Sequence, residues 1–321
     1  RIITHNGGNL STEDGDILVK YLDEHLGNDA VQFITGIQYR HLLIIRRGSK
    51  HVECAPPHDY PSHEWRPLLV KSEAGWEGVR EPIVDFDGNP TGEMRMTGQE
   101  TADLLNDLIL RSQQLLTEHP YNVGKATANE RQANSIWPWG GGYRPKMKTI
   151  IQRYPQVKSG SVISAVDLIR GIGKYAGLDV IKVPGATGLS NTNYEGKAEA
   201  AIDALRKQDF VFLHLEASDE AGHDGDLSLK LRTIEYLDHR IVEPIYNMVN
   251  SWDEAVCIAV LPDHPTPVEV RTHVKEPVPF LIWHPGIEAD SVDCYDEVAC
   301  VSGSYGMLHL EEFMDTLMKI D

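Results

Sequence analysis

The sequence has 321 residues, which is more than one compact core usually organises, so two lobes are expected. Its 48 aspartates and glutamates outnumber its 30 lysines and arginines, and the resulting formal net charge of −18 argues against nonspecific binding to nucleic acid or anionic lipid. No apolar run is long enough to span a membrane, and four cysteines without a CxxC pair are too few for a disulfide scaffold, so the cytoplasm is the expected compartment.

The first half of the chain has the pattern of an irregular α+β lobe. Four elements are expected in it: a capped helix between Ser11 and Gly27, strands at 31–35 and 41–45, and a helix at 101–119. We expect this lobe to occupy residues 1–157.

From about residue 160 onward, short apolar strands alternate with helical patterns. Strands are expected at 161–165, 179–183, 209–215, 255–261 and 278–283. Helices are expected before Tyr175, at 196–207, between Leu231 and Met248, and at 310–318. This alternation predicts a mostly parallel, doubly wound sheet in an α/β lobe that occupies residues 158–321.

Aspartates and histidines gather in three segments near the ends of these expected strands. The segments contribute Asp219 with His223, Asp263 with His264, and His273. The carboxyl ends of parallel strands form the edge where open α/β sheets bind ligands, and Asp and His are the usual ligands of an ion such as Mn²⁺ or Zn²⁺. The alternative is that these side chains cap helices and satisfy loop backbone, but their joint placement favours a metal site. The adjacent Asp-His pair suits either two neighbouring ions or one ion in a bent loop.

The first lobe carries weaker signals for a small anionic ligand. Arg40 and Arg144 have the planar guanidinium that grips phosphate or carboxylate, although a single arginine is more often a surface ion pair. The glycines at 140–142 allow a close approach of the backbone to a ligand or simply form a flexible turn. No Walker loop or dinucleotide pattern is present, so nucleotide binding has no support.

Taken together, these segments resemble the archaeal type of the 2,3-bisphosphoglycerate-independent phosphoglycerate mutases. The resemblance extends over essentially the whole chain. It is carried by TGIQYRH at 35–41, PHD at 57–59, ANSIW at 133–137, VPGATG at 183–188, HLEASDEAGH at 214–223, LPDHPTP at 261–267, and TH at 272–273 leading to PVPF at 277–280.

The resemblance implies a two-domain metalloenzyme of the alkaline phosphatase superfamily. Residues 158–321 would form the later part of an α/β domain with a mostly parallel sheet that binds two divalent ions. Residues 1–157 would form a smaller inserted α+β domain that holds the substrate. Mn²⁺ is the expected metal, with Mg²⁺, Zn²⁺ and Co²⁺ as alternatives, and 2,3-bisphosphoglycerate is not required. The family pattern assigns one ion to Asp219, His223 and His273, and the other to Asp263 and His264.

The implied reaction interconverts 3-phosphoglycerate and 2-phosphoglycerate, phosphorylated three-carbon acids, through a phosphoserine. Arg40, His58 and Asp59 match the substrate-contact motifs of the inserted domain. Lys158 matches a lysine that contacts substrate near the metals, and Arg144 stands one position beyond the basic residue that usually follows the glycine segment.

The sequence departs from the family pattern at its N-terminal end. The family's metal-binding aspartate and serine nucleophile are expected upstream of Arg1. We therefore expect the chain alone to be inactive. Two other functions stay open: a phosphomonoester hydrolase or phosphotransferase on the same metal centre, and a non-catalytic metal- or phosphoester-binding protein. A domain that carries Arg40 and His58 favours the mutase, because a simple hydrolase needs no second gripping domain. The oligomeric state stays open.

Overall fold

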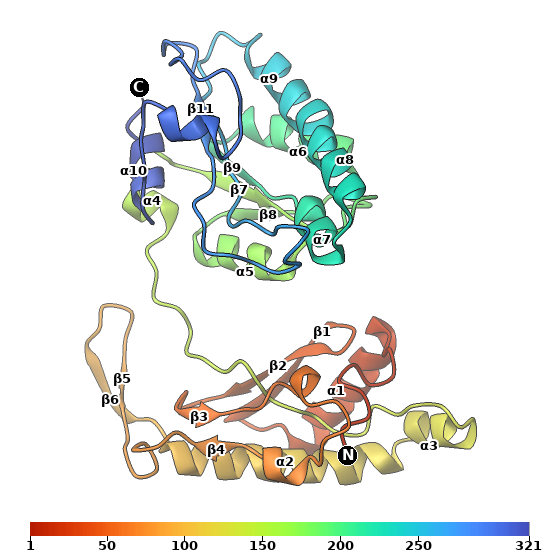
Figure 1. Cartoon of the computed structure of the whole chain (residues 1–321). Helices are drawn as coiled ribbons and strands as arrows, with labels where there is room; N and C mark the ends of the chain where they lie inside the picture. The colour runs from red at the N-terminus through yellow and green to blue at the C-terminus, as the bar shows by residue number, and fades with distance from the viewer. Residues whose placement is uncertain (321) are drawn as a thin grey trace. The chain divides into compact units, whose positions relative to one another are not determined.

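The computed structural model describes residues 1–320, which divide into an N-terminal unit, Arg1–Lys146, and a C-terminal unit that begins at Met147 (Figure 1). The sequence places its lobe boundary later, after residue 157. Residues from 147 onward belong to the second unit because helix α4 (Ile150–Arg153) is hydrogen-bonded to it. The Ile150 N–H donates to the Ala176 carbonyl oxygen at 2.9 Å. The assignment of the two lobes to substrate and metal stays a prediction.

The N-terminal unit is built on two helices and a hairpin. Helix α1 (Thr12–Leu26) begins where the Ser11 hydroxyl accepts the Asp14 N–H at 3.1 Å, as its sequence predicts. Strands β1 (Val31–Ile37) and β2 (Arg40–Ile45) form the expected antiparallel pair. Helix α2 (Gly98–Glu118) starts three residues before its predicted position, because Thr97 and Glu100 form a capping box.

The core of this unit forms where α1, α2 and β1 bury their apolar faces against one another. Its buried members include Leu18, Leu22, Val31, Phe33 and Leu108. The remaining elements of the unit are short: β3 (Val52–Glu53), η1 (Pro57–Asp59), η2 (Arg66–Leu68), β4 (Lys71–Ser72), β5 (Pro82–Val84), β6 (Pro90–Met94) and α3 (Pro120–Thr127).

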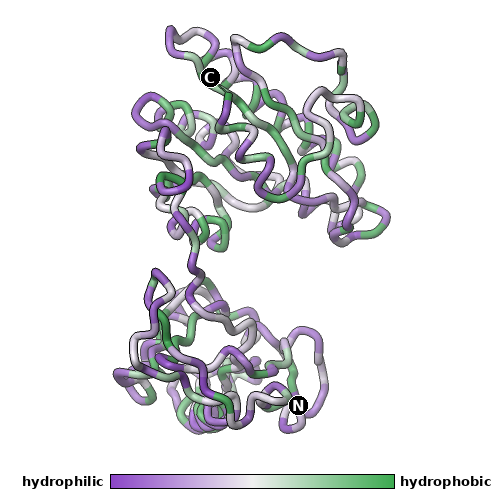
Figure 2. The backbone as a smooth tube through the Cα atoms, turned by 90° about the vertical axis from the view of Figure 1, so that its left-hand side faces the viewer, coloured by the Kyte–Doolittle hydropathy of each residue, from purple (hydrophilic) through white to green (hydrophobic). Residues whose placement is uncertain are grey.

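The C-terminal unit contains a three-stranded parallel sheet in the order β8-β7-β9. Its strands are β7 (Gly160–Ile163), β8 (Asp179–Ile181) and β9 (Phe210–Leu213), and Figure 2 shows hydrophobic stretches of the chain within this unit. The connections run in opposite directions along the sheet, from β7 to β8 and from β8 back to β9. Right-handed crossovers then put α5 (Asp167–Tyr175) and α6 (Tyr194–Leu205) on opposite faces, which is the expected doubly wound arrangement.

The last two expected strands do not extend the parallel sheet by hydrogen bonding. Strand β10 (Ile258–Val260) pairs with β11 (Leu281–Trp283), and the pair is antiparallel. The long connection between them contains no helix among its residues 261–280. A parallel return needs a crossover that is usually helical, so this irregular connection brings the strand back antiparallel.

The long helix expected between Leu231 and Met248 is interrupted. The structure divides it into α8 (Leu227–Leu237), a π-helical turn η3 (Asp238–Val242) and α9 (Glu243–Val249). Pro244 lacks an N–H and its ring collides with the carbonyl four residues earlier, so a wider turn accommodates it. The unit also contains α7 (Ala217–Asp224), η4 (Ala299–Ser302) and α10 (Glu312–Leu317).

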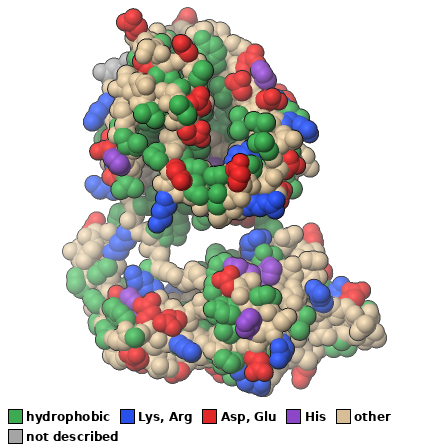
Figure 3. Space-filling view, in the orientation of Figure 1, with side chains coloured by type: hydrophobic (Ala, Val, Ile, Leu, Met, Phe, Trp, Pro, Cys, Tyr) green, Lys and Arg blue, Asp and Glu red, His purple; other side chains and the backbone are tan. Residues whose placement is uncertain are grey.

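The surface of the described residues carries charges of both signs. Acidic and basic side chains are spread over both units on the face seen in Figure 3. Within residues 1–320, no helix combines the length and the apolar character needed to cross a membrane.

Candidate functional site

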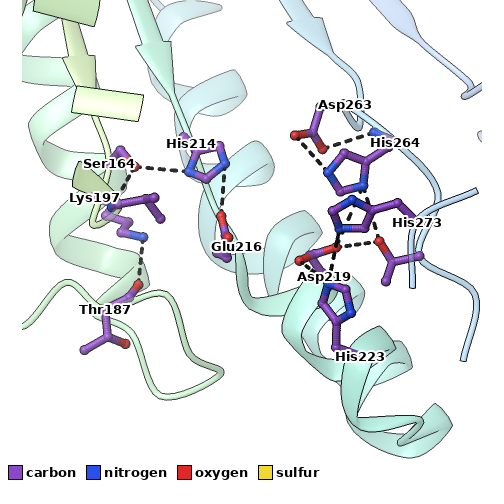
Figure 4. A network of polar contacts seen from close by, with 12 residues as sticks. Ser164, Thr187, Lys197, His214, Glu216, Asp219, His223, Asp263, His264 and His273 are labelled. Atoms are coloured by element: carbon purple, nitrogen blue, oxygen red, sulfur yellow. Dashed lines mark hydrogen bonds and ion pairs between the residues drawn. The ribbon is translucent and has the colours of Figure 1, made fainter. Parts of the chain in front are cut away.

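Three of the predicted metal ligands converge in the C-terminal unit (Figure 4). Asp219 and His223 lie on α7, and His273 lies in the connection between β10 and β11. Nε2 of His223 is 3.3 Å from Oδ2 of Asp219 and 3.1 Å from Nε2 of His273. One potential ligand atom from each residue lies within 4.8 Å of the other two. Three such atoms around one point are a donor set that can coordinate a divalent cation.

Local structure explains the convergence. Helix α7 begins shortly after the carboxyl end of β9, and the four-residue spacing puts Asp219 and His223 on one helix face. Nδ1 of His223 lies 3.1 Å from the carbonyl oxygen of Arg271. A proton on that nitrogen satisfies the carbonyl and leaves the Nε2 lone pair for a metal, which is the usual orientation of a histidine ligand. The residues present therefore fit a divalent ion.

The second predicted pair adjoins this cluster. The rings of His264 and His273 stack with their centroids 3.7 Å apart, and Nδ1 of His264 is 3.9 Å from Oδ1 of Asp219. Asp263 lies beside His264, with Oδ2 of the aspartate 3.3 Å from Nε2 of the histidine. All five predicted ligands thus lie in one neighbourhood, and the assignment of Asp263 and His264 to a second ion stays a prediction.

The electrostatic field at this site favours a cation. Glu216 precedes α7, and its pKa is raised by burial and then by the nearby carboxylates of Asp219, Glu220 and Asp263. Carboxylates that repel one another in this way are stabilised when a cation binds between them.

A network beside the cluster was not singled out from the sequence (Figure 4). Both ring nitrogens of His214 have polar partners. Nδ1 lies 3.1 Å from Oγ of Ser164, and Nε2 lies 3.2 Å from Oε2 of Glu216. Burial lowers the pKa of His214. Its position directly after an apolar strand is the sequence signal that marks this residue as an edge rather than a core histidine.

Lys197 is a second residue that the sequence did not reveal. It is 1% exposed on α6, and Nζ lies 3.4 Å from the Thr187 carbonyl oxygen. Burial, followed by the nearby charge of Arg170, lowers the pKa of Lys197. The signal is a lysine on the alanine-rich face of a helix, because Ala198 and Ala201 beside it are buried as well.

Lys158, in contrast, is separated from the metal-ligand cluster. It precedes β7, its backbone N–H donates to Oδ2 of Asp209 at 2.7 Å, and its ammonium group donates to the Pro155 carbonyl. It therefore lies at the amino ends of the parallel strands, whereas Asp219 follows the carboxyl end of β9. The role of Lys158 as a substrate contact, which the family resemblance implies, stays a prediction.

Three predicted substrate residues share one region of the N-terminal unit. The Arg40 guanidinium lies 4.6 Å from the centre of the Tyr39 ring, and that ring meets His5 edge-on at 5.4 Å. His5 in turn lies 6.1 Å from His58, whose Nε2 is 3.6 Å from Oδ1 of Asp59. Histidine side chains gather on the visible face of this unit in Figure 3. The aromatic residues between Arg40 and His58 were not predicted as contacts.

Arg144 is exposed and directly follows an anchored residue. The hydroxyl of Tyr143 donates to Glu81, and the Arg95 guanidinium lies 3.7 Å from the centre of the Tyr143 ring. These contacts fix the backbone on one side of Arg144. Its role toward a substrate stays a prediction.

Comparisons with known proteins identify the family of this chain. Residues 80–319 match the family model of the Metalloenzyme superfamily, and residues 1–122 match that of 2,3-bisphosphoglycerate-independent phosphoglycerate mutase. The chain is 41% identical to a protein of that name from Methanosarcina acetivorans, over 100% of this chain and 74% of the relative. It is 37% identical to 2,3-bisphosphoglycerate-independent phosphoglycerate mutase 2 from Methanothermobacter thermautotrophicus, over 99% and 72% of the two chains.

Solved structures have the same fold. A protein from Pyrococcus horikoshii matches with a TM-score of 0.74 and 26% identity, over 99% of this chain and 72% of that one. A cofactor-independent phosphoglycerate mutase from Thermoplasma acidophilum matches with a TM-score of 0.61 and 21% identity, over 98% and 71%. These neighbours confirm the expected α/β fold class. The chain belongs to the 2,3-bisphosphoglycerate-independent phosphoglycerate mutases, within the metalloenzyme superfamily.

Proposed function

We propose that this protein interconverts 3-phosphoglycerate and 2-phosphoglycerate in a metal-dependent reaction that needs no 2,3-bisphosphoglycerate. The observation that carries the proposal is the convergence of Asp219, His223 and His273 in a chain with mutase relatives. Mn²⁺ is the metal we favour, because a mixed carboxylate and imidazole site suits it, with Mg²⁺, Zn²⁺ and Co²⁺ as alternatives. We assign Asp263 and His264 to a second ion, and we expect the reaction to take place in the cytoplasm.

Each part of the site has a task in phosphoryl transfer. Divalent ions held by the five predicted ligands would stabilise the negative charge on the attacking and leaving oxygens during transfer of the phosphoryl group. The Arg271 carbonyl holds His223 in the ligating tautomer, and Lys197 supplies buried positive charge near Glu216 in an otherwise acidic protein. The family's serine nucleophile is not assigned to a residue of this sequence.

The N-terminal unit supplies the residues that we assign to the rest of the substrate. Arg40 offers two parallel N–H donors to a carboxylate or phosphate, and His58 and Asp59 offer a donor and an acceptor for the glycerate hydroxyl. A grip on the glycerate while the phosphoryl group is detached is what distinguishes a mutase from a hydrolase, because the same acid must be available for the return transfer.

The test has a metal-binding part and a turnover part. Calorimetric titration of the 321-residue chain with Mn²⁺ should show strong loss of binding in Asp219→Asn and His273→Asn. Glu235→Gln is the matched control, since Glu235 is an exposed acid on helix α8 of the same unit and is not one of the carboxylates around Glu216. Unchanged Mn²⁺ binding in His273→Asn would remove the metal site from this position.

For turnover, protein expressed from the complete gene is incubated with 3-phosphoglycerate, with and without chelator and without 2,3-bisphosphoglycerate. Chelator-sensitive formation of 2-phosphoglycerate supports the mutase. Release of inorganic phosphate without 2-phosphoglycerate indicates the hydrolase, and metal binding with neither product indicates a binding protein.

A further inference from the structure

Thr266 touches both groups of predicted metal ligands. It lies two residues after His264 in the loop that follows β10, and it is only 3% exposed. Its hydroxyl donates to Oδ1 of Asp219 and lies 3.3 Å from Nδ1 of His264. One side chain thus meets a ligand that the proposal assigns to one ion and a ligand that it assigns to the other.

The chemistry of a hydroxyl dictates how these contacts are used. It has one proton to donate and lone pairs to accept, so donation to the Asp219 carboxylate leaves it to accept from Nδ1–H of His264. A proton on Nδ1 leaves the Nε2 lone pair of His264 free for a metal. On Asp219 the hydroxyl occupies Oδ1, and Oδ2 remains directed at His223, whose Nε2 is 3.3 Å away.

The position of Thr266 is fixed by neighbouring helices. The ammonium group of Lys230, on α8, donates to the Thr266 carbonyl oxygen at 2.5 Å. The loop also packs directly against Gly222 on α7, where an added Cβ would lie 2.3 Å from the same oxygen. Pro265 and Pro267 restrict the backbone on either side. The hydroxyl is therefore held in place before any ion binds.

We propose that Thr266 is a positioning residue that orients Asp219 and His264 together for metal binding, an inference that rests on the metal site of the proposed function. Groups that hydrogen-bond to ligands fix the tautomer and direction of those ligands, and their loss typically costs 10- to 100-fold in metal affinity. Because Thr266 contacts both ligand groups, its hydroxyl also links the geometry of one group to that of the other.

Three variants separate the hydroxyl from the shape of the side chain. Thr266→Val keeps the branched shape without the hydroxyl, and Thr266→Ser keeps the hydroxyl. Thr233→Val is the matched control, because Thr233 is fully buried on α8 and its hydroxyl donates to the Lys230 carbonyl at 2.8 Å. Titration calorimetry of the metal-free 321-residue chain with Mn²⁺ should show roughly 10- to 100-fold weaker binding for Thr266→Val, with Thr266→Ser and Thr233→Val close to the parent.

The same experiment shows whether the effect is only structural. In a double-mutant cycle with His264→Gln, the combined loss should be smaller than the sum of the single losses, because both changes break one contact. Thermal unfolding of the metal-free variants checks folding, and if Thr266→Val does not fold, Thr266→Ala takes its place with the same expectation.

Parent-like Mn²⁺ binding by Thr266→Val, or equal losses for the serine and valine variants, overturns the proposal. Mn²⁺ binding without mutase turnover in the protein from the complete gene would instead overturn the proposed function and leave the role of Thr266 in metal binding intact.

Discussion

Nδ1 of His214 lies 3.1 Å from Oγ of Ser164, and these two residues come directly after the neighbouring strands β9 and β7. The other ring nitrogen meets Glu216, whose backbone carbonyl accepts the Asp219 N–H at 2.9 Å. A chain of polar contacts thus runs from the sheet to the helix that carries a predicted ligand. The Ser164 hydroxyl also accepts a hydrogen bond from the Val166 N–H at 3.0 Å, and Ser164 is only 2% exposed. The Ser164 hydroxyl is therefore a structural group rather than a nucleophile.

Replacement of His214 by leucine should destabilise the C-terminal unit. The change leaves the buried Ser164 hydroxyl and the partly buried Glu216 carboxylate without their shared partner, which costs about 2 kcal/mol. The free energy of unfolding from urea titration at neutral pH is the measurement. His239→Leu is the control, because His239 is an exposed histidine of the same unit. Equal losses for the two leucine variants would show that the His214 contacts contribute nothing specific.

His41 should make the N-terminal unit sensitive to mild acid. The Gly36 N–H donates to Nδ1 of His41 at 3.1 Å, and Nε2 is buried without a hydrogen-bond partner among residues 1–320. Burial lowers the pKa of His41 below its usual 6.5, so the unfolded chain binds the proton more readily than the folded one. The contribution that neutral His41 makes to the free energy of unfolding is fully present above pH 6.5. It is lost as the pH falls from 6.5 toward the lowered pKa of the folded state.

The measurement is the free energy of unfolding as a function of pH for the parent and His41→Asn. Below pH 6.5, the free energy of unfolding should decrease less steeply in the variant than in the parent. His63→Asn, at an exposed position, should keep the parent's slope. A His41→Asn profile that is parallel to the parent would contradict the assignment.

Local signals in the sequence predicted much of this structure. Ser11 marked the start of α1 because a cap acts within one turn, and the apolar strand before Asp219 marked the edge where ligands gather. The antiparallel pairing of β10 and β11 was missed because the direction of a strand depends on the path of a long connection, which no local pattern encodes. The contacts of Lys197 were missed for a related reason: its helix α6 packs against β7 and β9, which lie at a distance from Lys197 in the sequence.

Arg240 should contribute to stability through its planar shape as well as its charge. Its Nε and one terminal nitrogen donate to the two carboxylate oxygens of Glu195 at 2.6 and 2.8 Å, and its guanidinium lies 4.5 Å from the centre of the Tyr194 ring. Arg240→Ala should lower the free energy of unfolding by about 1 to 2 kcal/mol. Arg240→Lys should recover only part of this loss, because an ammonium group cannot bind both oxygens in a plane.

Acid should remove the contribution of this ion pair. The hydrogen bonds from Arg240 hold the pKa of Glu195 at about 2, against 4.5 in the unfolded chain. The stabilisation is therefore fully present above pH 4.5 and is lost as the pH falls toward 2, so the difference between the parent and Arg240→Ala should narrow over that range. If the difference in the free energy of unfolding stayed constant on acidification, the contact of Arg240 with the Tyr194 ring would account for all of it.

Two alanine substitutions in helices of the C-terminal unit should have opposite effects. An added Cβ at Gly222 would lie 2.3 Å from the Thr266 carbonyl oxygen, which the Lys230 ammonium group holds in place, whereas an added Cβ at Gly171 meets nothing within 4 Å. Alanine stabilises a helix by about 1 kcal/mol relative to glycine, so Gly171→Ala should raise the free energy of unfolding by that amount. At Gly222 the collision should outweigh this gain, with an overpacking cost of about 1 to 3 kcal/mol.

The same collision should reach the metal site. To relieve it, α7 must move away from the loop of Thr266, which separates the Asp219 carboxylate from the hydroxyl that orients it. We therefore expect Gly222→Ala, and not Gly171→Ala, to weaken Mn²⁺ binding in a calorimetric titration of the metal-free chain. If Gly222→Ala bound Mn²⁺ as tightly as the parent despite its lower stability, the packing of α7 against this loop would have no part in holding the ligands.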